Sequence, residues 1–231
     1  MSMLTLGIPS KGRLMEQAQE VLLKAGFGIE RIGSDRGYRG RLTGIANVEV
    51  TFLSAADIAA ALKSGEIDCG ITGEDLLRET IAPDNPVADV ALRLNFGLAD
   101  VVVAVPNFWL DVAQMADLDD VAQQFYSVHG RRLRVATKYI NLTRRFFAAK
   151  GVTGYRIVES LGATEGAPAA GSAELIVDIT TTGSTLKANN LKVLDDGLIL
   201  SSSAVLAVTS KARPNSAITK ICGAISGIIT N

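Results

Sequence analysis

The stretch from Glu174 to Leu186 constrains the fold of this chain more than any other. It reads Glu-Leu-Ile-Val-Asp-Ile-Thr-Thr-Thr-Gly-Ser-Thr-Leu, an apolar run followed by a threonine- and glycine-rich turn and the start of a helix. A buried strand, a short turn and a helix form the unit from which parallel α/β sheets are built. The first N–H groups of a helix lack partners within it and favour an anion. The stretch therefore predicts an α/β protein with a phosphate-binding turn.

The side chains of this turn suit a phosphoribosyl group. Gly183 permits a positive φ or a close approach of the backbone to a ligand. Hydroxyl donors come from Thr181, Thr182, Ser184 and Thr185, and Leu186 follows them. Asp178 is expected at the carboxyl end of the strand, where α/β sheets bind ligands, and its carboxylate can accept hydrogen bonds from ribose hydroxyls. Glu174 lies four residues earlier on the same strand face. The alternative is a capped turn beside a strand-end acid.

A second strand-to-helix turn, near the start of the chain, carries two cations. A strand is expected at 4–8 and a helix at 15–25, with Ser10 as the helix N-cap. Lys11 and Arg13 bracket Gly12 in the turn between them, a placement that suits substrate phosphates. A solvated surface pair is the alternative interpretation.

Composition excludes several classes of function. The chain has 231 residues, 48% of them hydrophobic and 20% charged, and a net charge of −1, so nothing indicates a nucleic-acid partner. No apolar run approaches the roughly 18 residues of a membrane-spanning helix. The run at 4–8 is too short for a signal peptide. We therefore expect a soluble cytoplasmic protein.

The cysteines and the single histidine exclude a metal cluster built by the chain. Cys69 and Cys222 lie far apart and lack metal-type spacing, so we expect two buried thiols in a reducing compartment. His129 is expected in a polar connector, which argues against a Ser-His-Asp triad. Catalysis is therefore expected from cations, hydroxyls, carboxylates or a metal ion that arrives with the substrate.

Strand and helix signals alternate along the chain and predict two α/β lobes. Further strands are expected at 48–53, 67–71, 87–94, 100–106, 133–137, 155–160 and 174–178, with two more within 191–208 around a turn at 195–197. Further helices are expected at 55–63, 140–150 and 216–230, and a connector followed by a helix at 107–126. We assign residues 1–97 and 197–231 to the first lobe and 98–196 to the second, with a central ligand cleft. The isoleucine stripe of the last helix is expected in the core or against a second copy.

Four motifs, in this order, resemble the ATP phosphoribosyltransferase family, the first enzyme of histidine biosynthesis. They lie at 5–14 (TLGIPSKGRL), 68–75 (DCGITGED), 135–139 (VATKY) and 174–186 (ELIVDITTTGSTL). The resemblance implies a two-lobed fold similar to periplasmic binding proteins. It also implies an attack of adenine N1 of ATP on 5-phosphoribosyl 1-pyrophosphate, which releases pyrophosphate in the presence of Mg²⁺.

The resemblance also assigns roles to residues. Phosphoribosyl-pyrophosphate binding falls to Glu174, Asp178, Thr181, Thr182, Gly183, Ser184, Thr185 and Leu186. ATP binding falls to Lys11, Gly12, Arg13, Arg36, Gly73, Asp75 and Glu165, and catalysis to Lys11, Arg13 and Asp178. Two positions depart from the family pattern. Ser54 stands where many members have arginine, a role left to Arg36, Arg39 or Arg41, and Glu174 stands where many have aspartate.

The length of the chain resembles the short form of the family, which implies a partner. That partner is a regulatory subunit similar to histidyl-tRNA synthetase, in a hetero-oligomer expected to be a hetero-octamer, beside a homodimer of the catalytic chain. Two other functions fit the residues. One is a non-catalytic binding module with the same fold. The other is a different phosphoribosyltransferase, although many of those have two adjacent acids where this chain has Asp178 and Ile179.

Overall fold

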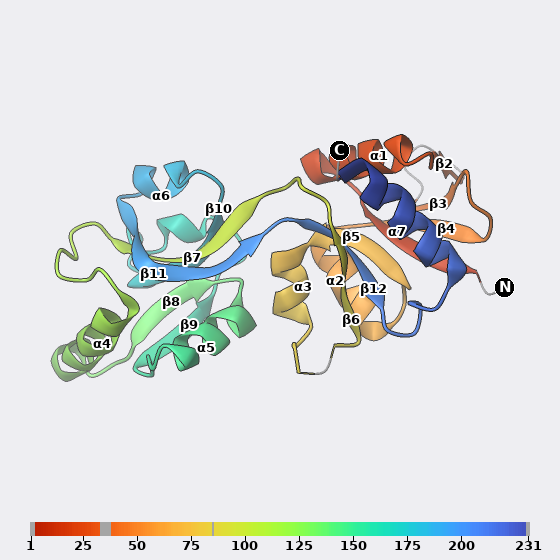
Figure 1. Ribbon diagram of the computed structural model, residues 1–231. Coiled ribbons are helices and arrows are strands. Elements are labelled where there is room, and N and C mark those ends of the chain that lie inside the picture. The colour runs from red at the N-terminus through yellow and green to blue at the C-terminus, as the bar shows by residue number, and fades with distance from the viewer. Residues whose placement is uncertain (1–2, 33–37, 85, 230–231) are drawn as a thin grey trace. The chain divides into compact units, whose positions relative to one another are not determined.

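The computed structural model describes residues 3–32, 38–84 and 86–229 and contains two β-sheets (Figure 1). The first compact unit comprises Met1–Leu98 and Ser203–Asn231, and the second is Ala99–Ser202. The chain thus leaves the first unit once and returns to it once. The return was expected after residue 196, whereas the units divide after Ser202.

A seven-stranded sheet forms the centre of the first unit, in the order β2-β3-β4-β1-β5-β12-β6. The strands are β1 (Leu4–Pro9), β2 (Ile29–Arg31), β3 (Arg39–Leu42), β4 (Val48–Leu53), β5 (Cys69–Gly73), β6 (Ala88–Arg93) and β12 (Ala204–Thr209). β1 runs parallel to both of its neighbours, β4 and β5, whereas β12 runs antiparallel to β5 and β6. The carboxyl ends of β1 and β5 therefore meet at one edge of the sheet.

Helices cover both faces of this sheet. They are α1 (Gly12–Lys24), α2 (Ala55–Ser64), α3 (Glu74–Thr80) and α7 (Ser216–Ile229). Alternate residues of β12 pack into different clusters: Leu206 joins α1 and α7, whereas Val205 and Ala207 join α2 and α3. This follows from the two-residue period of a strand. Ile221 of α7 is fully buried in the first cluster, which confirms the core as the place of the isoleucine stripe.

The second unit has a five-stranded sheet in the order β11-β7-β10-β8-β9. Its strands are β7 (Ala99–Pro106), β8 (Leu133–Thr137), β9 (Tyr155–Glu159), β10 (Leu175–Thr180) and β11 (Leu191–Ser202). Its helices are α4 (Met115–His129), α5 (Ile140–Ala149), the short α6 (Ser184–Ala188) and a 3₁₀ turn, Thr164–Gly166. β10 is parallel to β8, with Ile176 opposite Ala136, and β8 is parallel to β9. The predicted α/β class is confirmed.

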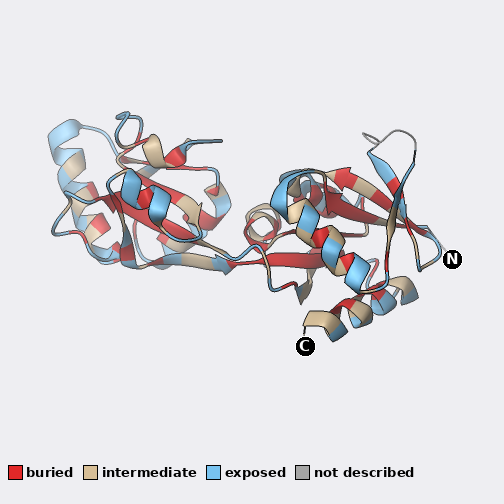
Figure 2. Cartoon of the chain, turned by 90° about the horizontal axis from the view of Figure 1, so that it is seen from above, coloured by how far each residue is buried: buried red, intermediate tan, exposed pale blue. Residues whose placement is uncertain are grey.

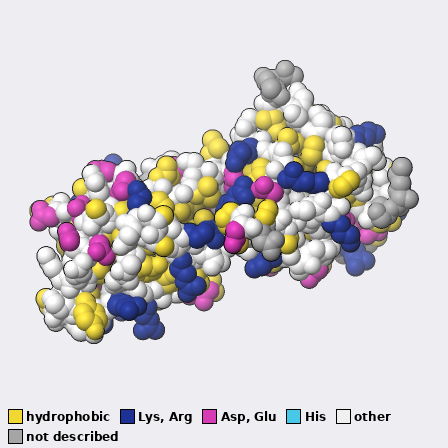
Figure 3. Space-filling view, turned by 60° about the horizontal axis from the view of Figure 1, so that its bottom comes forward, with side chains coloured by type: hydrophobic (Ala, Val, Ile, Leu, Met, Phe, Trp, Pro, Cys, Tyr) yellow, Lys and Arg dark blue, Asp and Glu magenta, His cyan; other side chains and the backbone are white. Residues whose placement is uncertain are grey.

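Buried residues follow the strands and the inner faces of the helices in both units (Figure 2). On the face shown in Figure 3, lysine and arginine side chains are interspersed with acidic and apolar ones, in keeping with the net charge of −1. Among the described helices, none has the length and apolarity needed to cross a membrane.

Three local predictions were wrong. Ser10 does not cap α1, because the helix begins at Gly12 and Lys11 occupies the N-cap position. His129 is the last residue of α4 rather than part of a connector, with its ring 4.2 Å from that of Phe125. No turn separates two strands at 195–197, because β11 continues to Ser202 with register shifts. There Asp196 accepts hydrogen bonds from the N–H of Met115, the first residue of α4, and from Lys150, the C-cap residue of α5. No local sequence pattern reveals these contacts.

Candidate active site

The threonine-rich turn links β10 to α6 in the second unit. Gly183 has φ +71° and occupies the N-cap position of α6, a conformation that strains residues with a side chain. Its N–H donates to Thr180 Oγ1 at 2.9 Å, and Thr182 Oγ1 donates to Ser184 Oγ at 2.9 Å. Local hydrogen bonds therefore fix the turn before any ligand binds.

The turn forms the wall of a pocket of about 370 Å³. The lining residues are Ala99, Ile179, Thr180, Thr181, Thr182, Ser184 and Thr185. Thr181, Thr182, Ser184 and Thr185 are exposed, so their hydroxyls are accessible from solvent, whereas Leu186 is buried beneath the turn. A small hollow rich in hydroxyl groups and backbone N–H groups suits a phosphate.

Asp178 is half-buried near the carboxyl end of β10, just before this turn. Its Oδ1 accepts a hydrogen bond of 2.8 Å from the N–H of Ile179. Burial raises the pKa of Asp178, and the negative charge of Glu165 acts in the same direction. The Ile179 N–H and the positive charge of Lys138 oppose this rise without cancelling it. Asp178, Glu165 and Lys138 therefore share one electrostatic environment.

Sequence reasoning assigned no role to Lys138, although it lies in the 135–139 motif. It follows directly after β8, and the β8–β10 pairing of Val135 with Leu175, continued along both strands, sets Lys138 beside Asp178. The Lys138 side chain is exposed and lies 5.0 Å from the ring of Tyr139, which is fully buried. The strand order was the missing information, since the sequence alone does not show that β8 and β10 are neighbours.

The basic turn lies in the first unit, after β1. Lys11 and Arg13 are exposed on either side of Gly12, whose φ is +74°. Neither side chain makes an ion pair with a residue that the structure describes. Both cations are therefore available to a ligand.

The turn after β5 lies at the same edge of that sheet, because Gly7 of β1 pairs with Gly70 of β5. Gly73 precedes α3, and Asp75 is buried in the first helical turn. A Cβ at Gly73 would clash with Asp75 Oδ1, so glycine leaves room for that carboxylate. The neighbouring acid, Glu74, is also buried and pairs with Arg93 at 2.8 Å.

The structure does not bring Glu174 to the phosphate turn. Glu174 precedes β10, whereas Asp178 lies four residues further along, about 13 Å at the usual rise of a strand. Its carboxylate accepts from the Arg134 backbone N–H at 2.7 Å and pairs with the guanidinium groups of Arg134 and Arg131. Partial burial favours the protonated form, but the bonds from Arg134 and Arg131 outweigh it and lower the pKa of Glu174 to about 2.

The structure does not decide which arginine takes the role of the one that Ser54 replaces. Arg36 lies outside the described residues. Arg39 and Arg41 are exposed on β3. Ser54 caps α2, with its Oγ accepting from the Asp57 N–H at 3.1 Å.

Comparison with known proteins adds sequence evidence to this geometry. The family model for ATP phosphoribosyltransferase (HisG) matches residues 54–227. The ATP phosphoribosyltransferase of Mesorhizobium japonicum is 63% identical over 212 residues, which cover 91% of each protein. That of Rhizobium meliloti is 54% identical over 228 residues, which cover 97% of this chain and 99% of the relative.

Solved structures resemble the chain in the same way. The ATP phosphoribosyl transferase (HisG:HisZ) complex from Thermotoga maritima contains a chain that is 28% identical, with a TM-score of 0.72, covering 97% of this chain and 100% of that one. The alkanesulfonate-binding protein SsuA from Xanthomonas axonopodis pv. citri is 15% identical with a TM-score of 0.53, over 96% of this chain and 71% of that one. The second likeness concerns the fold alone and confirms the expected similarity to solute-binding proteins.

Proposed function

The chain belongs to the ATP phosphoribosyltransferase family, and from this premise we propose which residues hold each substrate. The family catalyses the first step of histidine biosynthesis. Adenine N1 of ATP attacks the anomeric carbon of 5-phosphoribosyl 1-pyrophosphate, and pyrophosphate leaves. In our assignment the turn of Thr181–Leu186 binds the 5′-phosphate, and Asp178 accepts hydrogen bonds from the ribose hydroxyls.

The pocket at this turn is the observation that carries the assignment. Its exposed hydroxyls offer donors to a phosphate, and Asp178, which directly precedes the lining residue Ile179, offers an acceptor for ribose. A preformed pocket reduces the entropy that binding must otherwise spend on ordering the turn. Glu174 is left out of the assignment, because its carboxylate already serves Arg131 and Arg134.

Lys11 and Arg13, with Gly12 between them, are assigned to the phosphates of ATP and to the pyrophosphate as it leaves. Negative charge builds on the leaving group in the transition state, so fixed cations lower the barrier. Adenine N1 has a free lone pair at neutral pH, so the reaction needs no strong base to begin. Gly73 and Asp75 are assigned to the ATP side, at the same sheet edge as Lys11.

Glu165 and Lys138 are assigned to the phosphoribosyl side instead. Both act electrostatically on Asp178, and all three residues belong to the second unit. The ammonium group of Lys138 suits the pyrophosphate of the substrate, whereas Glu165 suits a hydroxyl or amino donor.

Phosphoribosyl transfer of this kind typically uses a divalent metal ion, and we propose Mg²⁺. Among the described residues there is no group of three or more histidine, cysteine or carboxylate side chains that would cage an ion. Asp178 and Glu165 supply the hard oxygen donors that Mg²⁺ prefers, and one or two carboxylates suffice when substrate phosphates provide the other ligands. The bound ion would neutralise charge on the pyrophosphate.

We also propose a regulatory partner. The Thermotoga maritima relative was solved as a HisG:HisZ complex. In our proposal this chain likewise assembles with a regulatory subunit similar to histidyl-tRNA synthetase, as a hetero-octamer built on homodimers of the catalytic chain. It would work in the cytoplasm, where ATP is supplied.

An absorbance assay in the adenine band tests the assignment. The reaction contains ATP, 5-phosphoribosyl 1-pyrophosphate, Mg²⁺ and pyrophosphatase, with and without the regulatory partner. Lys11→Ala and Asp178→Ala should each lower turnover on the order of 100-fold, the usual loss for one charge-stabilising contact. Lys24→Ala, on an exposed residue at the far end of α1, serves as the matched control. Parental turnover in both site variants would refute the assigned site.

A further inference from the structure

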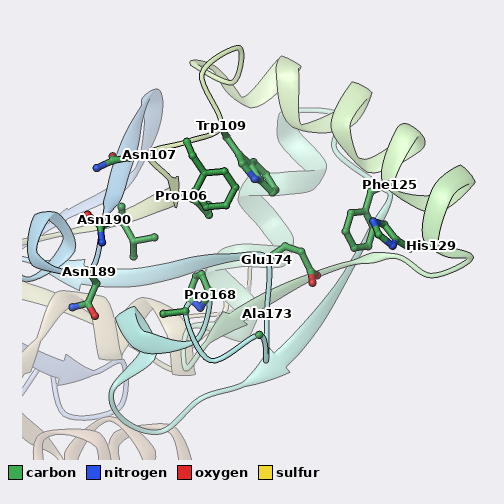
Figure 4. A pocket seen from close by; sticks show the side chains of 14 residues that line it. Pro106, Asn107, Trp109, Phe125, His129, Pro168, Ala173, Glu174, Asn189 and Asn190 are labelled. Carbon is green, nitrogen blue, oxygen red and sulfur yellow. The ribbon is translucent and has the colours of Figure 1, made fainter.

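A second pocket of the second unit lies at the end of β10 opposite to Asp178 (Figure 4). Its volume is about 710 Å³. It is formed by the segment that follows β7, the last turns of α4, the loop before β10 and the segment between α6 and β11. None of the residues assigned to catalysis lines it, and pockets of this size bind small organic molecules.

Aromatic and proline side chains form the middle of this pocket. Trp109, the single tryptophan of the chain, faces Pro168 across it, and Pro106 lies behind (Figure 4). At one end the ring of Phe125 packs between His129, at 4.2 Å, and the guanidinium of Arg131, at 4.7 Å. Flat apolar walls of this kind favour a planar ring, which stacks on an indole at little entropic cost.

Asparagine side chains gather at the other end (Figure 4). The Asn107 N–H donates to the Asn190 carbonyl at 2.8 Å, which joins the two segments. Asn189 Nδ2 donates to the Thr185 carbonyl at 2.9 Å, so its Oδ1 remains an acceptor. The exposed Asn190 amide makes no hydrogen bond with any part of the chain that the structure describes. It therefore offers an adjacent donor and acceptor to a ligand.

The charge at the pocket does not demand an ionic ligand. Glu174 lines the pocket, but both of its carboxylate oxygens are taken by Arg131 and Arg134. An aromatic wall beside a free asparagine amide instead suits the recognition of a purine. The base stacks on the wall, and the amide pairs with an adjacent donor and acceptor on the edge of the ring.

We propose that this pocket binds a purine nucleoside, with the base stacked on Trp109 and its polar edge paired with Asn190. The site is separate from the one that binds the substrates. The ribose is uncharged and faces the open side of the pocket. The proposal does not depend on which residues perform the transfer reaction.

Tryptophan fluorescence of the full chain tests the proposal, because Trp109 is the only reporter. Adenosine should change the signal saturably, with half-saturation at or below about 1 mM. Asn190→Gly removes the amide without strain, since Asn190 has φ +56°, and should weaken binding about tenfold or more. Asn47→Gly is the matched control, because Asn47 is also exposed, with φ +61°, but lies in the first unit. It should titrate like the parent.

Three further titrations make the test decisive. Ala169→Phe fills the pocket from an exposed position and should abolish the signal. Gly73→Ala, which displaces the Asp75 carboxylate on the ATP side, should leave the signal intact; its loss would mean that adenosine reports the ATP side, and would overturn the proposal. Uridine should bind more weakly, and equal binding would overturn the assignment to purines. The absence of any saturable change, or parental binding by Asn190→Gly, would also overturn it.

Discussion

Asp178 lies near the carboxyl end of β10, and Lys138 directly follows β8, the parallel neighbour of β10. An acid and a cation therefore lie near the phosphate turn. With the residues that the structure describes, neither forms an ion pair: Asp178 accepts a hydrogen bond from the Ile179 N–H, and Lys138 is exposed. Folding therefore leaves both groups able to meet a ligand, at some cost to the stability of the folded state.

Replacing Lys138 tests its assignment to the pyrophosphate. Lys138→Gln removes the charge and keeps the length of the side chain. We expect the KM for 5-phosphoribosyl 1-pyrophosphate to rise about tenfold or more, the usual size of a lost charged contact. Initial rates at varied substrate concentrations measure this effect. Lys63→Gln, on an exposed residue of α2, is the control, and equal behaviour of the two variants would contradict the assignment.

Asp178 should reduce stability while it serves function. Its pKa is raised by burial, so the folded protein binds this proton more tightly than the unfolded chain does. The free energy of unfolding therefore falls as pH rises through the ordinary aspartate range and beyond. Asp178→Asn should be more stable than the parent at about pH 7, and the difference should shrink in acid. Urea unfolding at several pH values measures it. A variant less stable than the parent at neutral pH would contradict this reasoning.

Among the elements, β10 has a carboxyl end assigned to ligand binding and an amino end held by ion pairs. Its carboxyl end carries Asp178 and the phosphate turn, whereas its amino end is fixed by Glu174 to Arg131 and Arg134. The sequence placed both acids on one strand face, which was sufficient to find Asp178 but not to separate the roles. The two arginines that form ion pairs with Glu174 lie about forty residues earlier in the chain. Local sequence patterns carry no information about such contacts.

Glu174→Gln should therefore act on stability. The folded pKa of about 2 lies below the ordinary 4.5, so the stabilisation is complete above the unfolded pKa and is lost as pH falls toward 2. We expect a loss of about 1–2 kcal/mol at neutral pH, after allowance for solvent screening. Turnover should stay near parental. Urea unfolding and initial rates separate the two effects, with Glu159→Gln on the exposed end of β9 as control. A large rise in the KM for 5-phosphoribosyl 1-pyrophosphate would instead show that Glu174 contributes to substrate binding.

How far local patterns predict an element depends on where its contacts lie. The apolar runs at 48–53 and 133–137 match β4 and β8 to the residue, because these strands are buried along one or both faces. The Asp195–Gly197 segment has the composition of a turn. Its polar groups instead bond to α4 and α5, so β11 passes through without reversing. The place of Lys138 beside Asp178 was not predicted for a related reason. It depends on β8 and β10 being neighbours, and strand order is not a local property of the sequence.

In the whole molecule, the second unit is one continuous segment with its own sheet and core. A segment with these properties is expected to fold without the rest of the chain. The polypeptide 99–202 should unfold cooperatively in urea and bind 5-phosphoribosyl 1-pyrophosphate without turning it over, because Lys11 and Arg13 are absent from it. Circular dichroism and calorimetry measure the two properties. A non-cooperative transition would show that the second unit needs the first.

The place of β12 also affects the order of events during synthesis. β12 lies between β5 and β6 in the finished sheet, yet it is made more than a hundred residues after them. While the second unit is translated, β5 is paired only with β1, and β6, the edge strand, has no strand partner. The second unit can therefore reach its native state first. The sheet of the first unit is completed last, when residues 204–209 emerge and form β12. Nascent chains stopped before that point should expose the edges of β5 and β6 to chaperones.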